Sequence, residues 1–434
     1  MQSMHRAQIR SEKRQPIVGP LAEFLAAETT GALVLLVATA AALIWANSEQ
    51  SPSYERLWTT QLAIRLADNT LLTLDLRHWV NEALMAVFFF VVGLEIKRQL
   101  VDGELADRRR AAVPIVAAFG GMVAPTLLYL WWNGAGDGAR GWGIPIATDI
   151  AFAIGALAIF GRGAPLGLRV FLLSVAIADD IGSVLVIAAF YTSHINFLAI
   201  GVAIVLLAAV LGLWRIKAFW SDPPLVVLMA AVWVATLASG VHPTIAGVAL
   251  GLLTPAGVTP QPSPAERLEH ALHPWTSYVI LPVFALANAG IAVNPASLLA
   301  AASSPVSLGV MLGLTVGKLI GVSAGAYAAV RSGIGVLPIG VGWGHIIAAA
   351  GLAGIGFTVS LFIALLSFPD DASLAEQAKV GVLLGSCLSL VVGGLLVHFS
   401  VRSAPSPDVS RSQAQDVSLD AVRRSTPRSQ GQGS

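Results

Sequence analysis

Long apolar runs separated by short polar connections dominate the chain. Each run is close to the about 20 residues that an α-helix needs to cross a bilayer. Twelve runs are present, at 21–47, 80–101, 111–132, 142–161, 165–191, 195–216, 224–239, 242–254, 271–293, 306–330, 340–368 and 377–400. The pattern therefore predicts an all-α polytopic membrane protein with a transmembrane domain over residues 21–402.

Three segments depart from this pattern. Residues 59–77, TTQLAIRLADNTLLTLDLR, alternate apolar and polar around a turn at Asp68–Asn69, which predicts a small external β-hairpin, with a simple loop as the alternative. Residues 1–20 are polar and basic and show no cleavable signal, so the run from Leu21 is expected to remain as an anchor. Residues 403–434 are rich in Ser, Arg, Gln and Pro and are expected to form a disordered cytoplasmic tail.

The distribution of Lys and Arg predicts the orientation of the chain. If both termini are cytoplasmic, 20 of the 26 basic residues fall inside, 5 fall outside and Lys318 lies within a span. Basic residues concentrate on the cytoplasmic side, so this arrangement is the predicted one, and the bacterial inner membrane is the expected location.

Composition excludes several classes of protein. Hydrophobic residues make up 56% of the chain and charged residues 12%, far below the about 25% typical of soluble domains. The net charge of +1 gives no indication of a nucleic-acid partner. The single cysteine, Cys387, excludes an intramolecular disulfide and a thiolate metal site.

Two spans carry residues that interrupt a helix. GIPIATDIAFAIGAL (143–157) contains Pro145 and an acid in mid-span, and GLAGIGFTVSLFIALL (351–366) has three glycines among its first six residues. Each has a threonine at the break, Thr148 and Thr358. Matching interrupted helices in the two halves of a chain mark the binding site of many transporters. Ordinary glycine-containing helices are the alternative.

Four ionisable residues lie near the middle of spans: Asp149, Asp179, Asp180 and Lys318, while Glu82 and Glu95 lie toward the ends of the second span. A charge at the bilayer centre costs from about 3 to above 10 kcal/mol, so intramembrane charges are functional by default. A purely structural ion pair accounts for one aspartate, but one lysine cannot neutralise three carboxylates.

Adjacent helical residues point about 100° apart, so one of Asp179 and Asp180 can face a cation site while the other meets Lys318. Asp180, Asp149 and the Thr148 hydroxyl offer hard oxygen ligands that suit an alkali cation. Competition between such a cation and a proton is the minimal chemistry of a cation/proton exchanger.

Other functions fit the residues less well. An intramembrane aspartyl protease needs two aspartates on facing helices near a GxGD signature, which the sequence lacks. A passive cation channel uses rings of repeated acids, whereas these charges are few and asymmetric and include a lysine. The channel and other cation/proton exchangers remain the alternatives. His242, His270 and His273 lie at span ends, either as interfacial residues or as pH sensors.

Several motifs together resemble the NhaA-type sodium/proton antiporters over about residues 20–400. They are IPIATDIAFAIGAL, LLSVAIADDIGSVLV, WVNEALMAVFFFVVGLEIKRQL, SGVHPTIAGV, RLEHALHPW, LPVFALANAGI, GKLIGVS and GIGFTVSLFIALL. The resemblance implies twelve transmembrane helices in inverted repeats, with the fourth and eleventh discontinuous and crossing. It also implies electrogenic exchange of Na⁺ or Li⁺ for protons without a cofactor, activation at alkaline pH, and a homodimer joined partly by the hairpin.

The resemblance also assigns roles to residues. Asp179 and Asp180 match the cation- and proton-binding pair, Asp149 and Thr148 the broken-helix residues beside it, and Lys318 the lysine that pairs with Asp179. The residues that match the pH response are Glu95, Glu269, His270, His273 and His242, and Glu82 matches an acidic residue near the entrance. Two departures fall in the pH-response region: Gln99 replaces a common Glu, and PAGVTPQPSP (255–264) lacks the usual charges.

Overall fold

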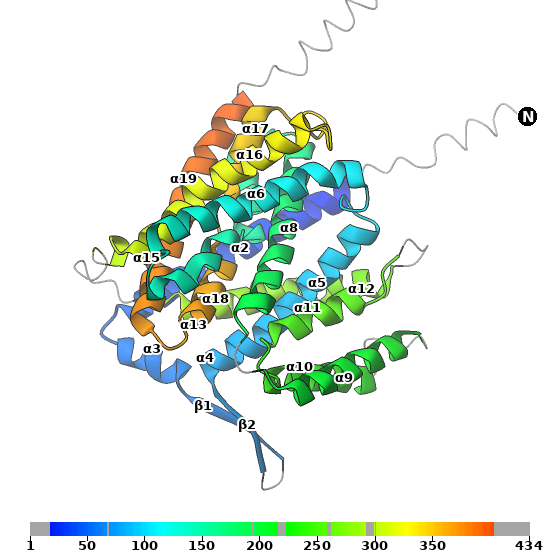
Figure 1. The fold of residues 1–434 in the computed structure, drawn as a ribbon, viewed down its shortest axis with the longest axis vertical. Helices are drawn as coiled ribbons and strands as arrows, with labels where there is room; N and C mark the ends of the chain where they lie inside the picture. Colours follow the sequence, from blue (N-terminus) through cyan, green and yellow to red (C-terminus); the bar gives the residue numbers. More distant parts are fainter. Residues whose placement is uncertain are drawn as a thin grey trace, which may run out of the picture.

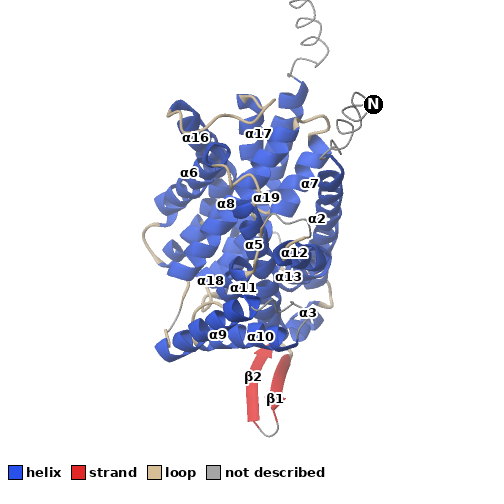
Figure 2. Ribbon diagram, turned by 90° about the vertical axis from the view of Figure 1, so that its right-hand side faces the viewer, coloured by secondary structure: helices blue, strands red, loops and turns tan. Residues whose placement is uncertain are grey.

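The structure is a computed structural model that describes residues 18–66, 69–192, 195–215, 223–257, 262–291, 299 and 301–402. Most of the predicted N-terminal segment, the predicted turn residue Asp68, residues 258–261 of the uncharged 255–264 connection and the predicted disordered tail lie outside these residues. In the described residues the fold is almost entirely helical, with one two-stranded ribbon at one end of the molecule (Figure 1, Figure 2).

The helices follow the apolar runs closely. Their bounds are α2 Val18–Ala46, α3 Ser51–Trp58, α4 Leu76–Trp79, α5 Met85–Val101, α6 Arg108–Asn133, α7 Ile150–Phe160, α8 Leu166–Phe190, α9 Phe197–Arg215, α10 Pro223–Ala238, α11 Thr244–Leu253, α12 Pro264–Trp275, α13 Leu281–Asn288, α15 Pro305–Leu312, α16 Lys318–Arg331, α17 Trp343–Ala353, α18 Phe357–Ser367 and α19 Ala372–Arg402. Short π turns, η1 Val80–Leu84, η3 Thr276–Ile280 and η4 Gly313–Gly317, continue α4 into α5, α12 into α13 and α15 into α16.

Seven of the described helical stretches are long and apolar enough to cross a membrane. Both predicted interruptions are present. The 3₁₀ segment η2 (Asp137–Ile146) meets α7 at a bend of 49°, and α17 meets α18 at a bend of 45°. The first interrupted stretch begins at Asp137 rather than at the predicted residue 142, because glycine-rich 3₁₀ turns precede the apolar run.

The segment 59–77 contains two antiparallel strands, β1 Gln61–Leu66 and β2 Asn69–Asp75, with an irregularity in the register after Ile64. Sequence reasoning missed the helix before it, α3. Its eight residues are too few for a clear apolar period, but a proline in its first turn favours helix initiation, and Tyr54 and Trp58 are buried.

Glycines bring two pairs of helices into backbone contact. A Cβ atom at Gly93 of α5 would lie 2.7 Å from the Val248 carbonyl of α11, and one at Gly325 of α16 would lie 2.9 Å from Cα of Ala117 in α6. Close approach of this kind is typical of small residues at membrane helix interfaces. The pairs α5–α11 and α6–α16 therefore form two closely packed units, seen as neighbouring ribbons in Figure 1.

Candidate ion-binding site

The two interrupted spans cross at their breaks and bond to each other there. The backbone N–H of Asp149 donates to the Ile355 carbonyl at 2.6 Å. The Thr148 hydroxyl contacts the Ala353 carbonyl at 2.7 Å, and the Ser360 hydroxyl donates to the Ile144 carbonyl at 2.7 Å. These bonds satisfy backbone groups that the breaks release, which a site inside a membrane requires.

Asp149 holds the N-termini of two helices at once. Its Oδ1 accepts from the Phe152 N–H of α7 at 3.1 Å. Its Oδ2 accepts from the N–H of Thr358 in α18 at 3.1 Å and from the Thr358 hydroxyl at 2.6 Å. A carboxylate is stabilised at the positive end of a helix dipole. Asp149 is therefore held by both interrupted spans, and both of its oxygens are engaged.

Asp179 pairs with the lysine. Oδ2 of Asp179 lies 2.5 Å from Nζ of Lys318 and 2.6 Å from the Thr148 hydroxyl. Both side chains of the ion pair are completely buried. The ion pair joins α8 to α16, and the hydroxyl of Thr148, at the break between η2 and α7, bonds to the same carboxylate oxygen. Three segments of the molecule therefore meet at this buried pair.

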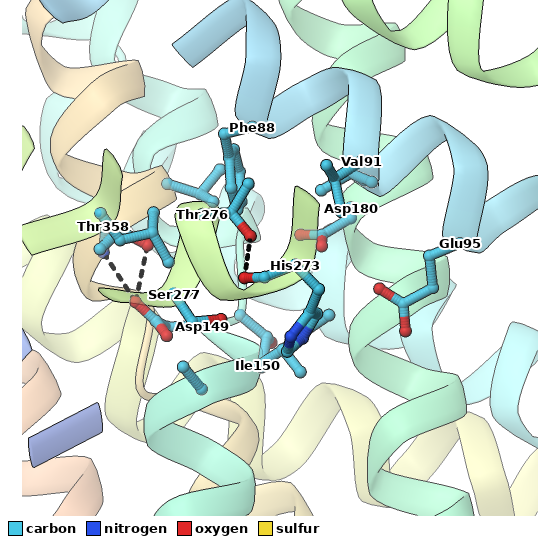
Figure 3. A pocket seen from close by; sticks show the side chains of 15 residues that line it. Phe88, Val91, Glu95, Asp149, Ile150, Asp180, His273, Thr276, Ser277 and Thr358 are labelled. Atoms are coloured by element: carbon cyan, nitrogen blue, oxygen red, sulfur yellow. Dashed lines mark hydrogen bonds between the residues drawn. The ribbon is translucent and has the colours of Figure 1, made fainter. Parts of the chain in front are cut away.

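Asp180 faces the other way, into a cavity of about 50 Å³. Its Oδ1 is buried and has no hydrogen-bond partner among the described residues. Figure 3 shows Asp180 and Glu95 on one side of this cavity and Asp149 and Thr358 on the other. The polar lining residues are Glu95, Thr148, Asp149, Asp180, His273, Thr276, Ser277 and Thr358.

The residues matched to the pH response divide into separate groups. Glu95 and His273 line the cavity. Glu269 instead forms a two-pronged ion pair with Arg98, at 2.8 and 2.9 Å, one helical turn after Glu95. His270 is exposed. Sequence reasoning missed Arg98, although an arginine three residues after Glu95 lies on the same helix face.

Glu82 and His242 lie together and outside the cavity lining. Nε2 of His242 is 3.5 Å from Oε1 of Glu82, and Nδ1 of His242 is 2.9 Å from the Thr244 hydroxyl. The backbone carbonyl of Glu82 accepts from the Trp233 indole at 3.0 Å. The structure thus separates this pair from the Asp149, Asp179 and Asp180 group that sequence reasoning had placed at the site.

Among Asp149, Asp179 and Asp180, the arrangement leaves one carboxylate without a counter-charge. Two helix N-termini and a hydroxyl engage Asp149, and Lys318 neutralises Asp179, whereas no ion pair with Asp180 is present among the described residues. A buried, unpaired carboxylate is strongly unfavourable unless it binds a proton or a cation. Carboxylate and hydroxyl oxygens are the ligands that hard cations prefer.

Comparisons with known proteins agree with this chemistry. A family model described as Na⁺/H⁺ antiporter 1 matches residues 22–397. The chain belongs to the NhaA family of Na⁺/H⁺ antiporters. A Na⁺/H⁺ antiporter NhaA of Frankia alni is 44% identical over 419 residues, covering 89% of this chain and 90% of its own. One of Sorangium cellulosum is 42% identical, with 91% and 92% covered, and one of Yersinia pseudotuberculosis is 44% identical, with 87% and 95% covered.

Membership of the NhaA family makes this chain a Na⁺/H⁺ antiporter and a multi-pass membrane protein. It is a transporter and not an enzyme, so the protease alternative is set aside. The predicted family resemblance and the predicted activity are both confirmed.

Proposed function

We propose that the protein extrudes Na⁺ or Li⁺ electrogenically in exchange for protons, with Asp180 as the carboxylate at which cation and proton compete. The observation that carries this proposal is the buried Oδ1 of Asp180, which faces the cavity without a hydrogen-bond partner among the described residues. The cation neutralises the carboxylate in one state and the proton neutralises it in the other. An ionised Asp180 with neither partner would be strongly unfavourable in this buried site.

Asp179, Thr148 and Lys318 support this exchange next to the cavity. When the cation binds at Asp180, the Thr148 hydroxyl, which lines the same cavity, supplies a further oxygen. Lys318 lies 2.5 Å from Asp179, and this pair is proposed to carry the second proton of the exchange. Asp149 keeps the two breaks together through Thr358, and so keeps the helix ends aimed at the cavity.

Exchange follows from alternating access. With the cavity open to one side, Na⁺ displaces a proton from Asp180 and a second proton leaves the Asp179–Lys318 pair. The loaded protein then exposes the site to the other side, where Na⁺ leaves and protons bind again, so more than one proton moves per Na⁺ and the exchange is electrogenic. The glycine contacts support this step, because α5 with α11 and α6 with α16 are packed closely enough to move as units. The proton gradient drives the cycle, and no bound cofactor is involved.

The proposed topology has twelve spans in inverted repeats, with both termini in the cytoplasm and the chain in the bacterial inner membrane. In its support, each of the twelve predicted runs coincides with a described helix or a pair of helices. The excess of basic residues at one end supports the orientation. We further propose a homodimer in which β1 and β2 contribute to pairing, because a two-stranded ribbon exposes strand edges.

We also propose that pH controls the exchange through Glu95, His273, Glu269, His270 and His242. The position of Glu95 and His273 on the cavity wall supports this role, because a charge there changes the field at Asp180. The Glu269–Arg98 pair anchors α12 to α5 beside them. Glu82, paired with His242, is proposed to lie near the entrance of the path that leads from a membrane surface to the ion site.

Dissipation of a pre-formed pH gradient in everted membrane vesicles tests the function. NaCl, LiCl or KCl is added between about pH 6.5 and 8.5, a window in which a carboxylate with a raised pKa or a histidine can change its charge. We expect Na⁺ and Li⁺, but not K⁺, to collapse the gradient in the wild type, and Asp180→Asn to abolish the response. An equal response in Asp180→Asn and wild type would refute the assignment of the site, while gradient collapse by every cation would favour a channel.

A further inference from the structure

A row of exposed side chains runs along α16, and their chemistry changes toward the C-terminal end of the helix. Ile320 is 58% exposed and Tyr327 is 56% exposed, and Ala324, Ala328 and Arg331 are exposed as well. These residues recur every three or four positions, so they lie on one face of the helix. The face passes from aliphatic to aromatic to cationic, which is the order of environments from the hydrocarbon core of a bilayer to its headgroups.

The neighbouring helix continues this surface. Trp343 begins α17, and Ile347 one turn later is also exposed, at 40%. The rings of Tyr327 and Trp343 are in contact, with centroids 5.5 Å apart and planes at 55°. The two rings therefore bridge the C-terminal end of α16 and the N-terminal end of α17, next to the small side chains of Ala324 and Ala328.

Further arginines lie at the same end of the molecule. The helices α6 and α16 pack antiparallel, and a Cβ atom at Gly335 would lie 3.3 Å from the carbonyl of Arg109. Arg108, Arg109 and Arg331 form no ion pair among the described residues, and all three are exposed. Arg110 is 3.7 Å from Asp107, so its charge is partly compensated.

The connection between α16 and α17 adds apolar surface beside these charges. Ile334 is 58% exposed, Val336 is 71% exposed and Ile339 is 96% exposed. Gly333 and Gly340 bound this segment with φ angles of +73° and +77°, which let the chain turn sharply at both ends. Exposed aliphatic side chains beside arginines are unfavourable in water but favourable at a bilayer surface.

We propose that the end of α16, the start of α17 and the start of α6 bind an anionic phospholipid. Arg331, at the same end of the molecule as Arg109, binds the phosphate, since guanidinium groups bind phosphate oxygens through paired hydrogen bonds. Tyr327 and Trp343 lie at the level of the glycerol backbone, and an acyl chain follows Ala324 and Ile320 along α16. The site lies away from the ion cavity and does not depend on the proposed exchange mechanism.

The lipid dependence of thermal unfolding tests this site. The full chain in a neutral detergent is titrated with phosphatidylglycerol, with phosphatidylcholine, or with inorganic phosphate. We expect phosphatidylglycerol to raise the unfolding midpoint of the wild type, and to raise that of Arg331→Gln and Tyr327→Ala by less than half as much. Phosphatidylcholine and inorganic phosphate are expected to give no comparable rise, because the first lacks net charge and the second lacks an acyl chain.

Two variants serve as controls. Arg331→Lys keeps the charge but loses the paired hydrogen bonds, so its shift is expected to lie between those of the wild type and Arg331→Gln. Arg56→Gln removes an exposed arginine from α3, where the neighbouring aromatic residues Tyr54 and Trp58 are buried, and is expected to behave like the wild type. Native mass spectrometry of the same samples counts retained phosphatidylglycerol directly. Equal shifts and equal retention in Arg331→Gln, Tyr327→Ala and wild type would overturn the proposal, as would an equal response to phosphatidylcholine.

Discussion

The bond between Asp149 and Thr358 joins the two interrupted spans, so its removal tests how the crossing is held together. Thr358→Val replaces the hydroxyl with a methyl group of similar size and removes the 2.6 Å bond to Oδ2 of Asp149. The backbone donors at 3.1 Å from Phe152 and from residue 358 itself remain. The variant therefore removes a hydroxyl donor from a buried carboxylate and leaves the packing volume nearly unchanged.

The expected cost is about 1.5–3 kcal/mol, the range for a hydrogen bond to a charged group. For a chain of 434 residues, an unfolding entropy of about 2.1 cal/mol/K per residue converts this cost into a fall of about 2–3 °C in the unfolding midpoint. We also expect the apparent affinity for Na⁺ to fall about tenfold, or about 1.4 kcal/mol, because the loosened crossing no longer fixes the helix ends at the cavity.

Thermal unfolding of the purified protein and Na⁺-dependent gradient collapse in vesicles measure the two effects. Thr358→Ser keeps the hydroxyl and should retain wild-type behaviour in both assays. Ser367→Ala, on the same helix, removes a hydroxyl that bonds to the Ile363 carbonyl and to the Tyr191 side chain and does not line the cavity, so its Na⁺ affinity should be unchanged. If Thr358→Val unfolded and transported like Thr358→Ser, the Asp149–Thr358 bond would not hold the crossing.

Two further changes test the packing and the buried ion pair. Lys318→Met should destabilise the protein by about 3–5 kcal/mol, because it leaves Asp179 buried without its cation. The double variant Lys318→Met with Asp179→Asn should lose less stability. Thermal unfolding of the wild type, of each single variant and of the double variant would show this difference. Gly251→Ala should cost about 1–3 kcal/mol, since its Cβ would lie 2.5 Å from a backbone oxygen of α5. Gly201→Ala in α9, where a Cβ meets nothing within 4 Å, should be neutral or stabilising by up to about 1 kcal/mol in the same assay.

Apolar runs and helix breakers predicted much of the fold, because a bilayer restricts a spanning segment to a helix of fixed length. Both interrupted spans were found because Pro145 and the glycines after residue 350 disfavour a continuous helix. The π turns and the helix α3 were missed. A π turn changes the hydrogen-bond spacing of a helix by one residue without any signal in the apolar pattern, and eight residues give too few turns for a period to be recognised.

The candidate site was predictable in its members but not in its geometry. Charges inside apolar runs identify Asp149, Asp179, Asp180 and Lys318 without any knowledge of the fold. Which aspartate meets the lysine depends on how α8 is rotated against α16, and that rotation is set by packing, so the residue pattern left the partner open and only the family resemblance indicated Asp179. The bonds of Asp149 to α18 cross more than 200 positions of the sequence, so no local pattern could reveal them.

Calorimetric titration of the purified protein with NaCl tests directly whether Na⁺ and a proton compete at Asp180. Performed in two buffers that differ in ionisation enthalpy, it measures the affinity for Na⁺ and the number of protons released as the ion binds. We expect Na⁺ binding to the wild type to release protons, and we expect Asp180→Asn to show neither binding nor release. Unchanged Na⁺ binding by Asp180→Asn, or binding to the wild type without proton release, would contradict competition between Na⁺ and a proton at Asp180.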